Sequence, residues 1–248
     1  MSRLVRSRYA VAEHPETRLQ ANSIPVAFWM LLNIITIPNL VDRLREEIAP
    51  VFTPPEGIPS RPVRVHDLGR LVRNSPLIRS TFYEVLRTCG GTVSNRVVTE
   101  DIMIAGRLFK QGTPVMLPAR PQHMDPAIWG EDYDQFVADR FIRAEDQGGQ
   151  FGDRGEKSQG KVDKNDIVRR RQAKERMMRP FGGGVSLCPG RFFANYEVWS
   201  FVSCLIWQYD ISMKEGEKIP TVDLRTPNLG VMTPTHDVKI RLVKRDGV

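Results

Sequence analysis

Residues 181–194, FGGGVSLCPGRFFA, place one cysteine on a glycine-rich turn directly before an apolar run that predicts a helix. Four residues of this stretch follow the pattern F-x-x-G-x-x-x-C-x-G: Phe181, Gly184, Cys188 and Gly190. A cysteine binds a metal as the thiolate, and the unpaired N–H groups at a helix N-terminus favour that charged form. Glycines let a bulky group approach the backbone closely, and Pro189 is expected at an early helical position, where its missing N–H costs nothing.

A lone cysteine is more often a plain buried core residue, but the four matching positions favour a ligand. They resemble the heme-ligand loop of the cytochrome P450 family. The resemblance implies that Cys188 is the axial ligand of the iron of heme b, that Phe181 packs against the porphyrin, and that glycines 184 and 190 allow the heme to approach. Thiolate ligation pushes electron density onto iron and favours cleavage of the O–O bond. The family usually has a basic residue two positions before the cysteine, which contacts a heme propionate, whereas this chain has Ser186.

A second motif, Glu84-Val85-Leu86-Arg87, places a carboxylate and a guanidinium three residues apart on one helical face. Such a pair alone is usually a solvated ion pair that contributes little to stability. In the family the E-x-x-R pair is buried and is completed by an arginine from a P-x-R-F segment, and residues 138–141, ADRF, resemble that segment with alanine in place of proline. The resemblance implies a structural triad of Glu84, Arg87 and Arg140. It also implies that Arg96 binds a heme propionate, the alternative being an ordinary surface arginine.

Residues 18–48 predict a long apolar helix to residue 37, with a kink or a locally broken hydrogen bond at Pro25, and then a second helix over 39–48. The first helix resembles the one that crosses the distal face of the heme in the family. The family's usual A-G-x-[DE]-T motif is replaced here by Ala-Asn-Ser-Ile-Pro, a version similar to that of the sterol 7α-hydroxylase and prostacyclin synthase branch. Ile24 replaces the acid and Pro25 replaces the threonine, so Asn22 or Ser23 is expected to serve the distal oxygen and proton site through water. The alternative is that both are merely polar groups of the helix interior.

The other segments predict short elements. We expect a helix over 75–88 with Ser75 as its N-cap, a buried helix over 191–208, and strands over 96–99, 102–104, 107–109, 114–117 and 238–243. The fold class is therefore mainly α with small β-sheets (α+β), the C-terminal part of the cytochrome P450 fold truncated at its N-terminus. We expect one partial domain over residues 1–248, with a distal-helix region at 18–48, the E-x-x-R helix, strands and P-x-R-F-like segment at 75–141, a polar loop insertion at 143–174, and the heme-ligand loop and following helix at 181–208.

The formal net charge of +7 invites a nucleic-acid partner, but the chain shows no basic stripe interleaved with aromatic residues. Basic residues instead gather just before the cysteine loop, at positions 169–171, 174, 176 and 179. The resemblance implies that an acidic, NADPH-dependent flavoprotein reductase docks there, because opposite charge raises the rate of association. The alternative is a solvated loop without a partner. Three cysteines are too few for a disulfide framework.

We find no signal peptide, and the longest apolar run, 24–37, is shorter than the about 20 residues that a spanning helix needs. No membrane anchor is therefore expected in this chain, although a full-length relative is expected at the endoplasmic reticulum membrane. The resemblance covers only the C-terminal half of the family.

The resemblance implies a heme-thiolate monooxygenase that oxidises a lipophilic small molecule of the sterol, terpenoid or polyketide type, with a place in secondary metabolism. Molecular oxygen and electrons from NADPH, delivered through the reductase, would drive the reaction. Two alternatives remain. The missing acid–threonine pair favours a heme-thiolate isomerase or dehydratase that does not activate oxygen, and the missing half favours a truncated, non-catalytic remnant.

Overall fold

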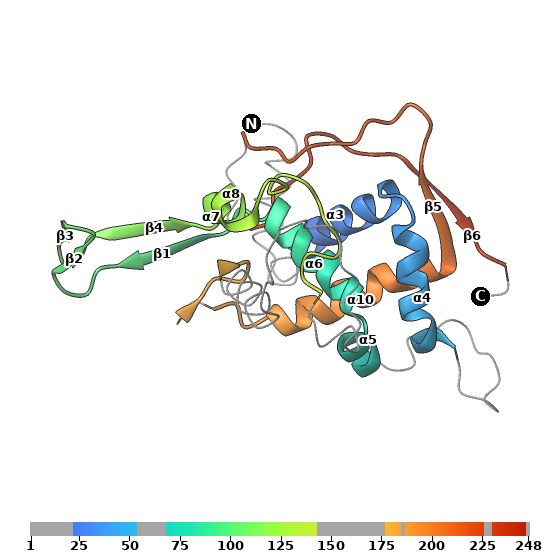
Figure 1. The fold of residues 1–248 in the computed structure, drawn as a ribbon, viewed down its shortest axis with the longest axis horizontal. Coiled ribbons are helices and arrows are strands. Elements are labelled where there is room, and N and C mark those ends of the chain that lie inside the picture. Colours follow the sequence, from blue (N-terminus) through green and yellow to red (C-terminus); the bar gives the residue numbers. More distant parts are fainter. Residues whose placement is uncertain (1–21, 54–67, 143–176, 185–186, 226–229, 247–248) are drawn as a thin grey trace, which may run out of the picture.

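The computed structural model describes residues 22–53, 68–142, 177–184, 187–225 and 230–246. Figure 1 shows a helical body from which a long two-stranded arm extends. The helices are α3 (Ser23–Thr36), α4 (Leu40–Phe52), α5 (Leu68–Asn74), α6 (Pro76–Cys89), α7 (Arg120–His123), α8 (Pro126–Trp129) and α10 (Arg191–Gln208). The strands are β1 (Val93–Val97), β2 (Ile102–Ile104), β3 (Arg107–Phe109), β4 (Pro114–Pro118), β5 (Tyr209–Met213) and β6 (Ile240–Lys244). The predicted class, helices with small β-sheets, is confirmed.

The core lies where α3, α6 and α10 pack against one another. Met30 and Ile34 of α3, Ile78 and Val85 of α6 and Val202 of α10 have no exposed surface. Burial of apolar side chains is the main favourable term in folding, so these three helices form the stable centre of the described chain. The cysteine loop, residues 181–190, immediately precedes α10 and is connected to this centre through that helix.

The apolar helix begins later than its pattern predicts. Within the described residues α3 starts at Ser23, so Pro25 lies in its first turn instead of its interior. The first four N–H groups of a helix have no partner within it, so the missing N–H of proline costs no hydrogen bond there. Within the described residues, neither the kink nor the broken hydrogen bond predicted at Pro25 is therefore found. Residues 18–21 lie outside the described part of the chain.

The second helix, α4, extends four residues beyond its predicted end at residue 48 and includes Pro50. Phe52 explains the extension, because its ring is buried and stacks on the ring of Trp207 with centroids 5.2 Å apart. This contact with α10 holds the last turn of α4 in place, although the sequence pattern of proline and glycine around it predicts a loop.

Helix α6 starts at Pro76 with Ser75 at its N-cap position, as predicted, but the Ser75 side chain does not form the capping bond. The Ser75 hydroxyl makes no capping bond, and the carboxylate of Glu47 on α4 accepts hydrogen bonds from the N–H groups of Leu77 at 2.7 Å and Ile78 at 3.0 Å. A carboxylate is favoured there because the helix N-terminus carries partial positive charge. Burial nevertheless raises the pKa of Glu47 to about 7, against the opposing effect of those two N–H groups and of nearby arginines.

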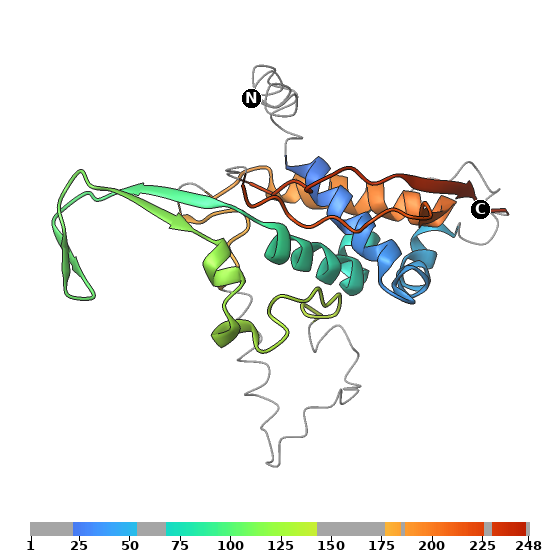
Figure 2. The same cartoon turned by 90° about the horizontal axis from the view of Figure 1, so that it is seen from above.

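Three two-stranded antiparallel sheets complete the described fold. In the arm β1 pairs with β4, from Val93 opposite Pro118 to Val97 opposite Pro114, and β2 pairs with β3 across a turn in which Ala105 and Gly106 both have positive φ. Figure 2 shows this arm projecting from the helices. The first strand covers 93–97 and not the predicted 96–99, because its register is set by pairing with β4.

The third sheet pairs β5, which directly follows α10, with β6. The sequence pattern predicts only a strand over 238–243, shifted from the observed 240–244. Helix α10 has its predicted bounds, but its first part is not buried as predicted, since Phe192 and Phe193 are each 61% exposed. Within the described part of the chain, the side chains that α10 buries begin at Val198.

Among the described residues, none of the helices by itself has the length and apolar composition needed to cross a membrane. The pair α3 and α4, bent by 115° at their junction, has the required length and composition only when the two helices are taken together.

Glu47→Gln tests the cap on α6. A raised pKa means that the folded state binds the proton more tightly than the unfolded chain, whose carboxyl has the ordinary value near 4.5. The stability gained from protonated Glu47 is therefore fully present below pH 4.5 and is lost as the pH rises towards 7. Relative to the variant, the wild-type chain should lose free energy of unfolding over this interval, as measured by urea denaturation at a series of pH values.

Glu46→Gln is the matched control, because Glu46 lies on the same helix with its side chain exposed. If both variants differ from the wild type by the same amount at every pH, the carboxylate cap does not titrate as described.

Candidate functional site

The cysteine loop is closed by two backbone hydrogen bonds. The N–H of Cys188 donates to the carbonyl of Phe181 at 2.9 Å, and that of Leu187 donates to Gly184 at 3.1 Å. Gly182 and Gly184 have φ values of 76° and 59°, which other residues rarely adopt. The loop thus holds an exposed cysteine at its end.

Helix α10 starts just beyond this cysteine. Gly190 is its N-cap and Arg191 its first residue, so Pro189 lies before the helix and not at the predicted early helical position. The fixed φ of proline suits the turn that it occupies there equally well. A Cβ atom on Gly190 would lie 3.9 Å from the Cys188 sulfur, and the Arg191 guanidinium donates to the Cys188 carbonyl at 3.1 Å.

Two of the predicted cofactor residues lie against the same loop. Arg96 of β1 donates to the carbonyl of Gly183 at 2.6 Å, which joins the base of the arm to the loop. Phe181 is half-buried, and its ring faces that of Phe82 on α6 with centroids 6.5 Å apart. The structure therefore brings Arg96, Phe181 and the cysteine together. Ser186, the other predicted contact, lies outside the described residues.

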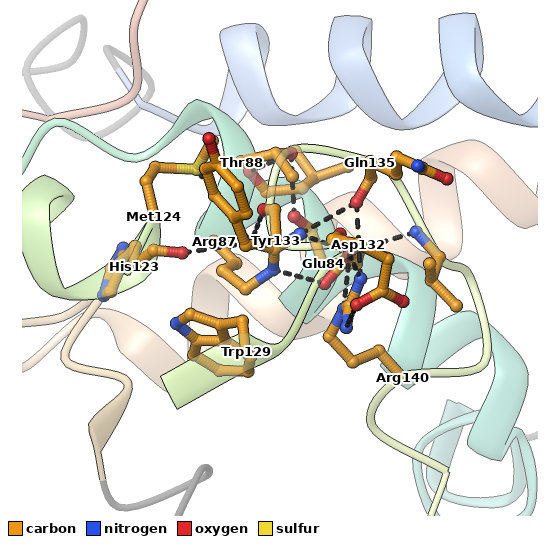
Figure 3. A network of polar contacts seen from close by, with 12 residues as sticks. Glu84, Arg87, Thr88, His123, Met124, Trp129, Asp132, Tyr133, Gln135 and Arg140 are labelled. Carbon is orange, nitrogen blue, oxygen red and sulfur yellow. Dashed lines mark hydrogen bonds and ion pairs between the residues drawn. The ribbon is translucent and has the colours of Figure 1, made fainter. Parts of the chain in front are cut away.

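The predicted triad is a buried polar cluster, shown in Figure 3. Arg87 donates to both carboxylate oxygens of Glu84, at 2.8 and 2.7 Å, and Arg140 donates to one of them at 2.9 Å. The backbone N–H of Val137 adds a fourth bond at 3.0 Å. Glu84 and Arg87 have no exposed side-chain surface. Buried charges of this kind are tolerated only when paired and fully hydrogen-bonded, and these are.

The two arginines also bind groups that no spacing in the sequence indicates. Arg87 donates to the carbonyls of His123 at 3.0 Å and Gln135 at 2.9 Å. Arg140 donates to the carboxylate of Asp132 at 3.0 Å. Burial opposes ionisation of Asp132, but its hydrogen bond to Arg140 and the charge of Arg140 outweigh burial and hold its pKa below the usual range. The segment after α8 is thereby fastened to α6.

His123 links this cluster to the cysteine loop. Its side chain is fully buried, and its Nε2 accepts a hydrogen bond from the backbone N–H of Arg179 at 3.4 Å. Burial, with the nearby charges of Arg87 and Arg120, lowers the pKa of His123 to about 4. The ring is therefore neutral near pH 7, which is the form that can accept this bond.

Asn22 and Ser23, the predicted distal residues, lie at the start of α3. The Asn22 side-chain oxygen accepts a hydrogen bond from the N–H of Val231 at 3.1 Å, and Ser23 is buried. Trp29, further along α3, donates to the carbonyl of Met232 at 2.7 Å. The side-chain oxygen of Asn22 thus fastens the C-terminal segment to α3, a contact across 209 positions that sequence reasoning missed.

Gly230 lies close to this contact. A Cβ atom placed on Gly230 would come within 1.9 Å of the Asn22 side-chain oxygen, so only glycine fits while Asn22 keeps its position. The predicted polar insertion at 143–174 and the basic residues at 169–171, 174 and 176 lie outside the described residues.

Comparison with known proteins agrees with this geometry. The model of the family described as Cytochrome P450 matches residues 20–242. A cytochrome P450 monooxygenase of Gibberella zeae is 31% identical, over 92% of this chain and 41% of that protein. The 7-alpha-hydroxycholest-4-en-3-one 12-alpha-hydroxylase of Oryctolagus cuniculus is 32% identical, over 90% of this chain and 42% of that protein.

A cholesterol 7-alpha-monooxygenase of Cricetulus griseus is 23% identical, over 90% of this chain and 42% of that protein. The predicted resemblance to the family, and to its sterol 7α-hydroxylase branch, is confirmed by these relatives. The chain spans about two fifths of the length of the relatives named here.

Replacing Glu84 by glutamine should destabilise the fold strongly. The change leaves Arg87 and Arg140 buried without their shared carboxylate, and removing one partner of a buried ion pair typically costs about 3–5 kcal/mol. Urea denaturation followed by circular dichroism measures the loss. Arg225→Gln, which breaks the exposed pair with Asp223, is the control and should change the unfolding midpoint little. Equal shifts in both variants would contradict a special role for the buried triad.

Gly230→Ala should destabilise the chain because the new methyl group collides with the Asn22 side chain. Asn22→Gly removes that side chain together with its bond to Val231. In the double variant the collision is absent, so its loss of stability should be smaller than the sum of the two single losses. Simple additivity of the three unfolding free energies would show that the two residues do not meet.

Proposed function

Because the chain belongs to the cytochrome P450 family, we propose that it carries the heme-thiolate half of a monooxygenase that oxidises a lipophilic small molecule. The observation that carries this proposal is the cysteine loop: Cys188 is exposed on a glycine-rich turn, and Arg96 is hydrogen-bonded to that turn. The proposed activity is that of a whole protein of the family. The relatives are longer than the part of them that this chain matches.

The residues of the loop fit an iron porphyrin. A thiolate is a soft donor suited to iron, and a guanidinium suits the carboxylates of the porphyrin. Cys188 would hold the iron, Arg96 a propionate, and Phe181 the ring, while Gly184 and Gly190 leave room for the approach. When bound, heme supplies the iron that activates molecular oxygen for insertion into an unreactive C–H bond. Ser186 remains a predicted second propionate contact without charge.

The groups that we propose for proton delivery lie at the start of α3. The oxygen of the Asn22 side chain is occupied by Val231, so a role in proton delivery falls to its amide nitrogen or to the hydroxyl of Ser23. Trp29 and Asn22 together fix the C-terminal segment across the start of this helix. This arrangement supports a positioned distal wall, which a monooxygenase needs to hold its substrate in one orientation.

The names of the relatives and the branch resemblance support a proposal for the substrate class. Two of the relatives named above act on sterols by their names. We therefore assign a sterol, terpenoid or polyketide-type substrate, in secondary metabolism. An NADPH-dependent flavoprotein reductase would supply electrons at the basic residues before the loop, and the whole protein would work at the endoplasmic reticulum membrane.

A heme-thiolate isomerase or dehydratase is the second candidate. It is favoured by Ile24 and Pro25, which occupy the positions of the acid and threonine that serve oxygen activation in the family. Turnover of a hydroperoxide or endoperoxide, without turnover by reductase and oxygen, would select this candidate over the monooxygenase.

The heme ligand can be tested without a substrate. The chain should be expressed with heme, reduced and exposed to carbon monoxide, and the red-shifted Soret band of a thiolate-ligated heme should appear. Cys188→Ala should abolish the band because the sulfur ligand is lost. Cys204→Ala removes another cysteine, half-buried on α10, and should leave the band intact. Retention of the band by the Cys188 variant would overturn the assignment.

A further inference from the structure

A cavity of about 290 Å³ lies beside the cysteine loop. Arg79 and Tyr83 of α6 line it from one side, and Met178 and Arg179, which lead into the loop, line it from another. Arg191 adds the first residue of α10. Because it is built from α6, α10 and the loop entrance, its shape is set by the same packing that holds the core.

All charged side chains among the described residues that line this cavity are positive. Three arginines line it, Arg79, Arg179 and Arg191, and no carboxylate is among its described lining residues. The charge of Arg79 also acts on the carboxylate of Glu47, whose pKa it lowers, so recognition of an anion is assigned to Arg179 and Arg191. The backbone of Arg179 is fixed by its bond to His123, and Arg191 is fixed by its bond to the Cys188 carbonyl. Guanidinium groups recognise carboxylates and phosphates through paired hydrogen bonds. The cavity therefore favours an anion.

The rest of the lining is apolar and aromatic. Phe141 and Met178 are 6% and 8% exposed, and the Phe141 ring lies 6.0 Å from that of Tyr83. Leu187 of the cysteine loop also lines the cavity. An inorganic ion would leave these surfaces uncovered, whereas a ring or short chain attached to the anionic group would bury them.

We propose that this cavity binds a small amphipathic anion, a single carboxylate or phosphate on an aromatic or short aliphatic body. The volume is at the lower limit of ligand pockets, which suits a body of about one ring. Phe181, Gly182 and Leu187 belong to both the cavity and the cysteine loop, but Cys188 does not line the cavity. The site is thus separate from the proposed iron ligand, although it shares Phe181 with the proposed heme site.

Phenyl phosphate is the probe for this site, and its binding to the full chain can be measured by calorimetry before and after heme loading. It should bind saturably with one site, and at least tenfold more tightly than inorganic phosphate or benzyl alcohol, each of which has only half of the required chemistry. If the chain does not bind heme, phenyl phosphate should still bind with this preference. The proposal for this cavity and the proposal for the heme ligand can therefore fail independently of each other.

Two variants test the location. Arg179→Gln removes one charge of the cavity, and Leu187→Trp fills it without changing charge, so each should weaken phenyl phosphate binding at least fivefold. Arg107→Gln, on the exposed arm, makes the same charge change and should alter the affinity less than twofold. Equal weakening by Arg107→Gln, binding of inorganic phosphate as tight as that of phenyl phosphate, or unchanged binding to Leu187→Trp would overturn the proposal.

Discussion

The fully buried carboxylate of Glu84 is the constraint on which the arrangement of the site depends. A buried charge must be paired, and two arginines and one backbone N–H satisfy it. Arg87 in turn binds the carbonyl of His123, whose ring accepts from the backbone of Arg179 at the entrance of the cysteine loop. A continuous polar path therefore runs from the triad to the loop, so displacing the carboxylate would displace the chain that presents the cysteine.

The loop is also held from the arm. Thr92, just before β1, donates to the carbonyl of Pro180 at 3.0 Å, and Arg96 on that strand donates to Gly183. These two bonds, one from the residue before β1 and one from the strand itself, hold both ends of the glycine-rich segment 180–183. This arrangement resolves a conflict between two needs, because glycines admit a large cofactor but make a loop flexible, and bonds from outside restore its rigidity.

Local spacing predicted much of this structure, and long-range contacts explain the rest. The pairing of Glu84 with Arg87 follows from helical periodicity, and the bounds of α10 follow from the apolar run after the cysteine, so both depend on neighbours in the sequence. The side-chain acceptor at the start of α6 does not, because Glu47 comes from another helix, 30 positions away, and accepts the N–H bonds that local preference assigns to the hydroxyl of Ser75 at the N-cap. The same holds for two other residues. Phe52 contacts Trp207 and keeps α4 helical where the prolines predict a loop, and the Asn22 side-chain oxygen accepts a bond from Val231, far away in the sequence.

Glu47 and His123 have a joint consequence. The unfolded chain restores both to their ordinary pKa values, so in mildly acidic solution unfolding makes Glu47 release a proton and His123 take one up. The proton released by Glu47 and the proton taken up by His123 nearly cancel, so together these two residues change the number of bound protons little on unfolding. A stability profile that is flat between about pH 4.5 and 6.5 would therefore conceal two strong and opposite titrations, each buried in a different part of the molecule.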